Sequence, residues 1–424
     1  MTERMLQLIA LAGGTVLVLF CVLFVRAAST SGKQLNGVEP VTIAVATDLH
    51  YLSPSLTDHG AYFEQMIRNA DGKVMEYSEE LIDAFVRQII TQQPDVLILS
   101  GDLTFNGEYQ SHTDLAEKLK QITDAGICVL VIPGNHDLDD PMAASFQGDS
   151  YRLVDSISAD QFVELYQDFG YGDALATDPT SLSYVAELRP GLRVLMVDVN
   201  TAEAPGQITA ETLSWVRKQL ADAAENGARV LAVSHQNMLQ HNTLFQDGFV
   251  MGNREELISL YERYNVICNL SGHMHIQHFA QRQNGLTEIV TSSLAVPPDQ
   301  YGILRLGGTS ADYHTVAVDV SGWAAEQQLN NNDLLQFTAY AKAFMQENAL
   351  RQTAAELKEN RDAEQMALFF AEVNAAYFAG RLDQVTWNDT LYEAWQAQGG
   401  FSAAYLSSIA ADIPNNYTAL SFDF

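Results

Sequence analysis

The fold of this chain is decided around one stretch, Pro133-Gly134-Asn135-His136-Asp137. An apolar run over residues 127–132 precedes it and has the length of a buried β-strand. The Pro-Gly pair then predicts a turn, since glycine allows the backbone conformations that a sharp turn requires. The asparagine and the histidine that follow can face one space at the carboxyl end of the strand. They form a site only if other strand ends supply partners.

Four other predicted strands also end in polar motifs. The strand over residues 41–47 is followed by Asp48-Leu49-His50, and the strand over residues 95–99 by Ser100-Gly101-Asp102. The strand over residues 230–233 is followed by Ser234-His235, and the strand over residues 266–270 by Ser271-Gly272-His273-Met274-His275. Amphipathic patterns between the strands predict helices over residues 77–93, 114–124, 209–225 and 255–264. This alternation favours a mainly parallel sheet, whose ligands gather at the carboxyl ends of the strands.

The strand ends supply carboxylate, imidazole and amide groups, which are all potential metal ligands. The candidate ligands are Asp48, His50, Asp102, Asn135, His235, His273 and His275. A single histidine beside a strand is more often structural than functional. Here every motif follows an apolar strand, and the joint pattern predicts a metal site.

In these five motifs the sequence resembles the calcineurin-like metallophosphoesterases, over residues 41–320. The resemblance implies two metal ions, one held by Asp48, His50 and His275 and the other by Asn135, His235 and His273, with Asp102 bridging both. Imidazole and carboxylate ligands suit Mn, Fe or Zn better than Mg. Such a pair would bind a phosphoryl oxygen and supply a bridging hydroxide that attacks phosphorus.

The resemblance also assigns a catalytic role to His136, as the acid that protonates the departing alkoxide. The reaction needs such a group because an alkoxide leaves poorly without a proton. Asp137 either orients that imidazole and holds it charged or serves the turn as a structural residue.

One departure and one closer match narrow the resemblance to a subgroup of the family. Purple acid phosphatases carry a tyrosine three residues after the bridging aspartate, where this chain has Phe105. The motif Gly101-Asp102-Leu103-Thr104, with Gly107-Glu108 and Ser111-His112, instead resembles the class III cyclic-nucleotide phosphodiesterases, in particular a Gram-positive membrane-attached or secreted branch with a helical C-terminal domain. His112 either approaches the substrate or is a structural residue at a helix start.

The expected fold class is α/β, with a two-sheet β-sandwich flanked by helices and an added all-α domain. Short strands near residues 276–281, 287–291, 302–306 and 315–320 would complete the second sheet. The expected boundaries are residues 1–40 for an N-terminal segment and linker, 41–323 for the metallophosphoesterase domain and 324–424 for a C-terminal domain of about four helices.

Residues 5–25 form an uncharged apolar run long enough for one membrane-spanning helix. We expect an anchor with the catalytic domain outside the cytoplasm. Secretion after cleavage near Val25-Arg26-Ala27 is the alternative.

The chain of 424 residues has 53 acidic and 23 basic residues, for a net charge of −30. This charge argues against duplex nucleic acid as a partner, and with it against a nuclease, because duplex binding relies on neutralising phosphates. The leading interpretation is a metal-dependent phosphodiesterase acting on a small substrate, with a cyclic nucleotide favoured. The alternatives are a phosphomonoesterase or nucleotidase on small phosphate esters, and a cell-surface binding protein that uses the helical domain. The sequence indicates no particular protein partner.

Overall fold

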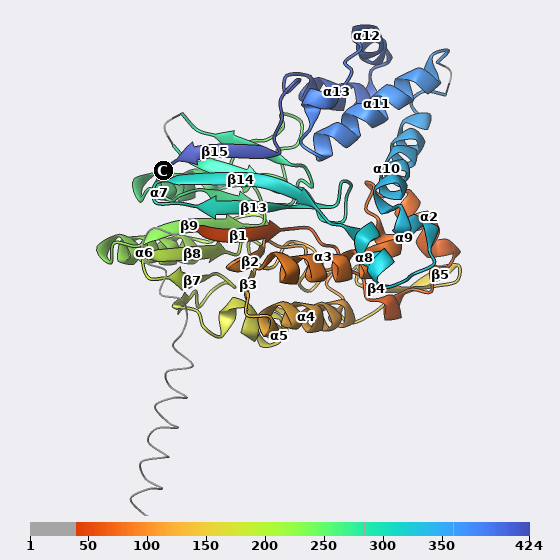
Figure 1. Ribbon diagram of the computed structural model, residues 1–424. Helices are drawn as coiled ribbons and strands as arrows, with labels where there is room; N and C mark the ends of the chain where they lie inside the picture. Colours follow the sequence, from red (N-terminus) through yellow and green to blue (C-terminus); the bar gives the residue numbers. More distant parts are fainter. Residues whose placement is uncertain (1–39, 284, 359) are drawn as a thin grey trace, which may run out of the picture. The chain divides into compact units, whose positions relative to one another are not determined.

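The computed structural model describes residues 40–283, 285–358 and 360–424, and Val41–Phe424 form one compact unit (Figure 1). The predicted anchor over residues 5–25 and almost all of the linker lie outside the described residues. Within those residues, no helix is both long and apolar enough to cross a membrane.

Two β-sheets form the centre of this unit. The first contains β15 (Ala419–Asp423), β14 (Ser310–Ala317), β13 (Gln300–Leu306), β1 (Val41–Ala46), β2 (Val96–Leu99) and β3 (Cys128–Val131), in that order. The second contains β11 (His278–Gln281), β12 (Thr287–Val290), β10 (Asn269–Ser271), β9 (Arg229–Ser234), β8 (Leu192–Val197), β7 (Tyr184–Arg189) and β6 (Ala176–Thr177). The predicted two-sheet sandwich is confirmed.

Side-chain alternation along β1 explains the layering. Ile43 and Val45 point between the sheets and share a buried cluster with Leu231 of β9. Ala44 points the other way, into a cluster that includes Phe85 of a covering helix. Successive side chains of a strand face opposite sides of the sheet, so an apolar strand buried on both faces needs cover on both.

Helices provide that outer cover. The first sheet packs against α3 (Ser78–Gln92) and α4 (Tyr109–Asp124), and the second against α6 (Ala210–Glu225) and α7 (Arg254–Arg263). Because β1, β2 and β3 run parallel, as do β8, β9, β10 and β12, the predicted polar motifs meet at one edge of the sandwich.

The long segment after β3 contains more structure than the sequence predicted. The sequence predicts one helix there, near residues 160–168, which is α5 (Ala159–Leu165) in the structure. The segment also forms a hairpin of β4 (Ala144–Gln147) and β5 (Ser150–Leu153), together with β6 and β7. All four residues of β5 are exposed. A strand without a buried face has no alternating apolar pattern to reveal it.

The C-terminal segment is helical, as predicted, but the described part contains six α-helices rather than about four. They are α8 (Val320–Glu326), α9 (Asn332–Leu335), α10 (Phe337–Ala354), α11 (Ala363–Phe378), α12 (Asp389–Gln398) and α13 (Gly400–Ala410). The first two are too short to show helical periodicity, and side chains of Asp319 and Asn331 cap them.

The last strand, β15, pairs antiparallel with β14, so the chain returns to the first sheet after the helices. Leu420, Phe422 and Phe424 pack against the core between the sheets. Their period-two spacing is typical of a strand, which was not among the predicted strands. The boundary at residues 323 and 324 stays a prediction.

Candidate dinuclear metal centre

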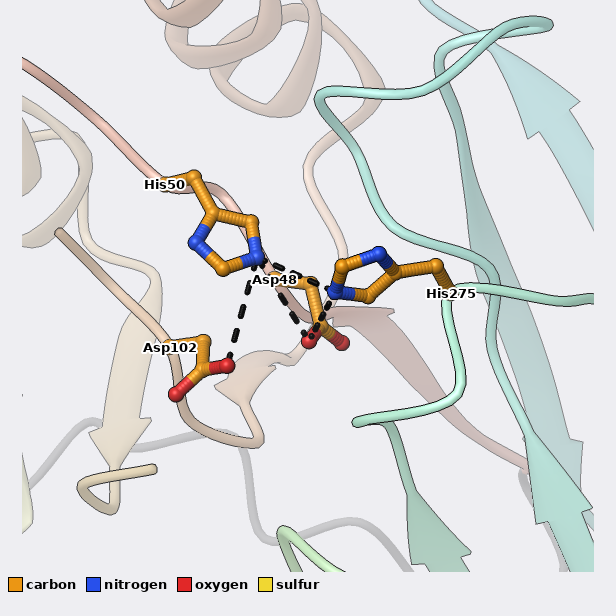
Figure 2. Close-up of side chains that lie close together, drawn as sticks. All are labelled: Asp48, His50, Asp102 and His275. Carbon is orange, nitrogen blue, oxygen red and sulfur yellow. Dashed lines mark hydrogen bonds and ion pairs between the residues drawn. The ribbon is translucent and has the colours of Figure 1, made fainter. Parts of the chain in front are cut away.

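The predicted ligands meet at the carboxyl ends of β1, β2, β9 and β10. Two groups have ligand atoms that all lie within 4.8 Å of one another: Asp48, His50, Asp102 and His275 form one, and Asp102, His235 and His273 form the other. Figure 2 shows the first group, with both imidazoles and both carboxylates turned toward one another. Asp102 belongs to both groups, which is the position that a bridging ligand requires.

The first group is tightly spaced. The Nε2 atoms of His50 and His275 lie 3.1 Å apart, and His275 Nε2 lies 3.2 Å from Asp48 Oδ1. His50 Nε2 is 3.9 Å from Asp102 Oδ2. The ligand atoms of this group are therefore close enough together to bind one shared metal ion.

The second group adds the amide predicted at the turn after β3. His235 Nε2 lies 3.2 Å from Asp102 Oδ2 and also 3.2 Å from Asn135 Oδ1. The rings of His235 and His273 are 5.0 Å apart at their centroids. All seven predicted ligands therefore lie in one continuous cluster.

The backbone of this cluster is unusual. Five of the seven predicted ligands have positive φ angles: Asp48 (50°), His50 (44°), Asp102 (48°), His273 (67°) and His275 (59°). Residues other than glycine rarely adopt this region, and such strain tends to concentrate at functional sites. Here it turns consecutive side chains of one motif toward the same centre.

Two glycines make the close approach of these loops possible. A Cβ atom at Gly134 would collide with the backbone and side chain of Asp102, and one at Gly272 with the side chains of Thr47 and Asp48. Both φ angles lie outside the left-handed region, so these glycines are required for space rather than for conformation.

The electrostatics leave the carboxylates ionised. Burial alone would raise the pKa of Asp48, but the charge of the adjacent His275 outweighs it and holds the pKa below its usual range. Burial is likewise outweighed at Asp102, whose pKa lies well below its usual value because of His235. Burial lowers the pKa of His273 to about 4, which keeps that imidazole neutral. Against the effect of burial, the neighbouring carboxylates raise the pKa of His235 and of His275 to about 9, so a metal ion must displace a proton from each of these two rings. Ionised carboxylates and neutral imidazoles are the forms that bind metals.

The donor set fits a pair of transition-metal ions. Asp48 Oδ1 is buried and has no hydrogen-bond partner among the described residues, although such a group normally has one. It faces imidazole nitrogens, and a shared cation would satisfy all of these atoms together. Nitrogen and oxygen ligands in this ratio suit Mn, Fe or Zn better than Mg.

Outer residues fix the ligands in place. His235 Nδ1 donates to the carbonyl oxygen of Ser100 at 2.9 Å, and the Thr47 hydroxyl donates to Asp48 Oδ2 at 2.7 Å. His275 Nδ1 bonds Asp71 Oδ2 at 2.8 Å. Asp71 lies in an insertion after α2 (Ala61–Arg68) and belongs to none of the five motifs, so no sequence pattern predicts its role.

His136 lies beside the first group, with its ring centroid 5.4 Å from that of His50. Its backbone N–H donates to Asp102 Oδ1 at 2.9 Å, so the turn also holds the shared carboxylate. Its Nδ1 lies 3.0 Å from Asn106 Oδ1 and 3.8 Å from Asp140 Oδ2. The side chain is 38% exposed, which suits a group that meets a substrate.

The prediction that Asp137 orients the His136 imidazole is wrong. The carboxylate of Asp137 is fully buried and accepts hydrogen bonds from the backbone N–H groups of Gly134, Leu103 and Thr104, at 2.8 to 3.1 Å. It ties the turn after β3 to the loop after β2, which is the structural alternative. Asn106 and Asp140 take the place beside His136.

His112 is also structural. It is fully buried, its Nε2 lies 3.0 Å from Thr104 Oγ1, and its Nδ1 lies 2.8 Å from the hydroxyl of Tyr166. Burial lowers the pKa of His112 to about 3, which keeps the ring neutral. Of the two readings left open by the sequence, only the helix-start role fits.

Comparisons with known proteins agree with this geometry. Residues 41–277 match the family model for calcineurin-like phosphoesterases, and residues 319–416 match a model described as the C-terminal domain of cyclic nucleotide phosphodiesterase.

Among curated proteins, the chain is 26% identical over 261 residues to a probable cyclic nucleotide phosphodiesterase of Psychrobacter arcticus, covering 60% of this chain and 80% of that protein. It is 25% identical over 191 residues to a glycerophosphodiester phosphodiesterase of Enterobacter lignolyticus, covering 44% of this chain and 58% of that protein. A dimetal phosphatase from Danio rerio aligns at a TM-score of 0.47 and 14% identity, covering 66% of this chain and 99% of that one. From the family match and the ligand set together, the chain belongs to the calcineurin-like phosphoesterases.

Proposed function

We propose that this protein is a metal-dependent phosphodiesterase for a small nucleotide diester, with a cyclic nucleotide as the favoured substrate. The main support for this proposal is the carboxylate of Asp102, which belongs to both ligand groups and lies directly beside the partly exposed His136. The names of the relatives and the match of the C-terminal segment support a diester over a monoester.

Two bound metal ions would polarise the phosphoryl oxygens and lower the pKa of a bound water, so that hydroxide would be present at neutral pH. Residues of this chain would orient the acid and deliver the proton. Asn106 Oδ1 accepts a hydrogen bond from His136 Nδ1, and Asp140 adds negative charge nearby. The opposite ring nitrogen of His136 is then the one that donates a proton to the leaving oxygen, a step that typically contributes ~10²- to 10⁴-fold.

A substrate screen with metal analysis tests the proposal. The protein would be loaded with Mn²⁺, Fe²⁺ or Zn²⁺ and assayed on 2′,3′- and 3′,5′-cyclic AMP, AMP and glycerophosphoethanolamine. We expect hydrolysis of at least one cyclic isomer with two metal ions bound per chain. Hydrolysis of AMP without activity on any diester would reject the proposal in favour of a monoesterase.

We also propose that residues 5–25 anchor the protein to a membrane with the catalytic unit outside the cytoplasm. The support is the uncharged apolar run in the sequence. Expression of the full chain with and without residues 1–39, followed by fractionation and protease treatment of intact cells, tests it. Release of the full chain into the medium at a shortened mass would show the cleaved alternative instead.

A further inference from the structure

A cavity of about 250 Å³ lies against the metal ligands, on the side of the helical C-terminal segment. His273 and His275 form one wall. Aromatic residues of α11 and α13 form another, among them Tyr377 and Tyr405. The volume is close to the lower end of the ~300–1,000 Å³ range of small-molecule sites. Such a cavity has room for one small group rather than for a whole dinucleotide.

Aromatic rings lead from a metal ligand to the surface along this cavity. The ring of Phe249 lies 5.5 Å from that of His273, and Phe245 lies 5.0 Å from Phe249. Phe401 follows at 6.3 Å from Phe245 and is 59% exposed. The Phe401 ring lies nearly parallel to that of Tyr405, at 11°. A large aromatic side chain exposed at the mouth of a cavity is a typical stacking surface.

Two side-chain amides add polar groups to this apolar wall. Asn374 Oδ1 accepts a hydrogen bond from the Tyr405 hydroxyl at 2.7 Å, and Asn374 Nδ2 donates to no described residue. Gln352 Nε2 donates to the carbonyl oxygen of Ala70 at 3.0 Å, which leaves its own oxygen as an acceptor. A free donor and a free acceptor beside aromatic rings match the mixed edge of a nucleobase.

The charge of the lining excludes a second phosphate group. Apart from the metal-facing histidines and two neutral tyrosines, the ionisable residue of the cavity wall is Asp71, and the wall includes neither lysine nor arginine. A phosphate or carboxylate placed there would meet no counter-charge. A neutral aromatic ring suits both the walls and the charge.

We propose that this cavity binds the base of the substrate nucleotide, so that the helical C-terminal segment determines substrate selectivity. The inference rests on the proposed function for the reaction itself. The phosphoryl group lies at the metal centre, and the base stacks along the series from Phe249 to Phe401. Asn374 and Gln352 contact the edge of the base.

Calorimetric titration of the Mn²⁺-loaded protein with AMP and with ribose 5-phosphate tests this, because both are monoesters that the proposed diesterase does not hydrolyse. We expect the wild-type protein to bind AMP roughly 5- to 150-fold more tightly than ribose 5-phosphate, which is the usual contribution of one base–aromatic stack. Phe401→Ala should remove most of that preference. Leu368→Ala is the matched control, because Leu368 is 52% exposed on α11 and lies outside the cavity wall.

Equal affinities for the two ligands in the wild-type protein, including the absence of binding by both, would overturn the inference. So would an AMP preference that survives Phe401→Ala. A second variant, Asn374→Asp, keeps the acceptor for Tyr405 and removes the free donor. It should weaken AMP binding roughly 2- to 10-fold, in line with one hydrogen bond, and leave ribose 5-phosphate unaffected.

Kinetics then separate this inference from the proposed function. Phe401→Ala should reduce kcat/KM for the cyclic nucleotide by a factor larger than for glycerophosphoethanolamine, which has no aromatic group. If the wild-type protein hydrolyses no diester, the proposed function fails, and the titrations still decide whether the cavity binds a base.

Discussion

His275 Nδ1 lies 2.8 Å from Asp71 Oδ2, although 204 residues separate them in the sequence. The same carboxylate oxygen also accepts from Lys73 Nζ at 3.1 Å. A carboxylate on the outer nitrogen of a ligating histidine fixes the orientation and tautomer of the ring and raises its basicity. The insertion after α2 thus reaches the metal centre from outside the motifs and completes it.

Asp71→Asn should weaken metal binding by ~10- to 100-fold, the usual effect of losing such an outer carboxylate. The first group of ligands should be affected, because Asp71 contacts His275 and not the second group. Titration of the metal-free protein with Mn²⁺ measures this. The exposed Asp149→Asn serves as a charge-matched control. Equal affinities for the two variants would show that Asp71 has no role at the metal.

Asp102→Asn should abolish hydrolysis and reduce bound metal at both positions, because both ligand groups share this carboxylate. The loss of activity should exceed the ~10- to 100-fold that outer residues contribute. Metal content by mass spectrometry and kcat/KM on the preferred diester check the two effects. A variant that retains two metal ions and full activity would place the site elsewhere.

His136→Ala should lower kcat by ~10²- to 10⁴-fold for a substrate with an alkoxide leaving group. The loss should be much smaller for bis-p-nitrophenyl phosphate, whose leaving group departs without a proton. Metal content should be unchanged, since the contact with Asp102 comes from the backbone of His136. A similar loss on both substrates would assign His136 a role other than acid catalysis.

Glu108 gives the stability of the protein a pH dependence. Its side chain is fully buried, one carboxylate oxygen has no partner among the described residues, and burial raises the pKa of Glu108 to about 7. The unfolded chain titrates near 4.5. Between these values the folded protein holds a proton that the unfolded chain lacks, so stability falls as the pH rises through this window.

Glu108→Gln should remove this dependence, because the amide is neutral at all pH values. Relative to the wild-type protein, the variant should gain up to about 3 kcal/mol in free energy of unfolding between pH 4.5 and pH 8.5. Urea unfolding of both proteins in EDTA measures it. Parallel pH profiles would show that Glu108 titrates normally in the folded state.

Much of the fold and of the ligand set could be predicted because both depend on local patterns. Apolar runs such as residues 127–132 predict buried strands, and the polar residues that follow each parallel strand must meet at one edge. By contrast, β5 has no buried face and therefore no alternating pattern. The period-two pattern of β15 indicates a strand but not its partner, because the chain pairs with β14 only after the helical segment.

The sequence alone determined the sandwich and the seven candidate ligands, because strand order and side-chain alternation place them at one edge. Only the tertiary structure decided the roles of the residues around that edge. Asp71 reaches His275 across a long separation, and Asp137 turns away from the adjacent His136 to bind backbone amides. Hydrogen bonds depend on distances in space, which neighbouring positions in a sequence do not set.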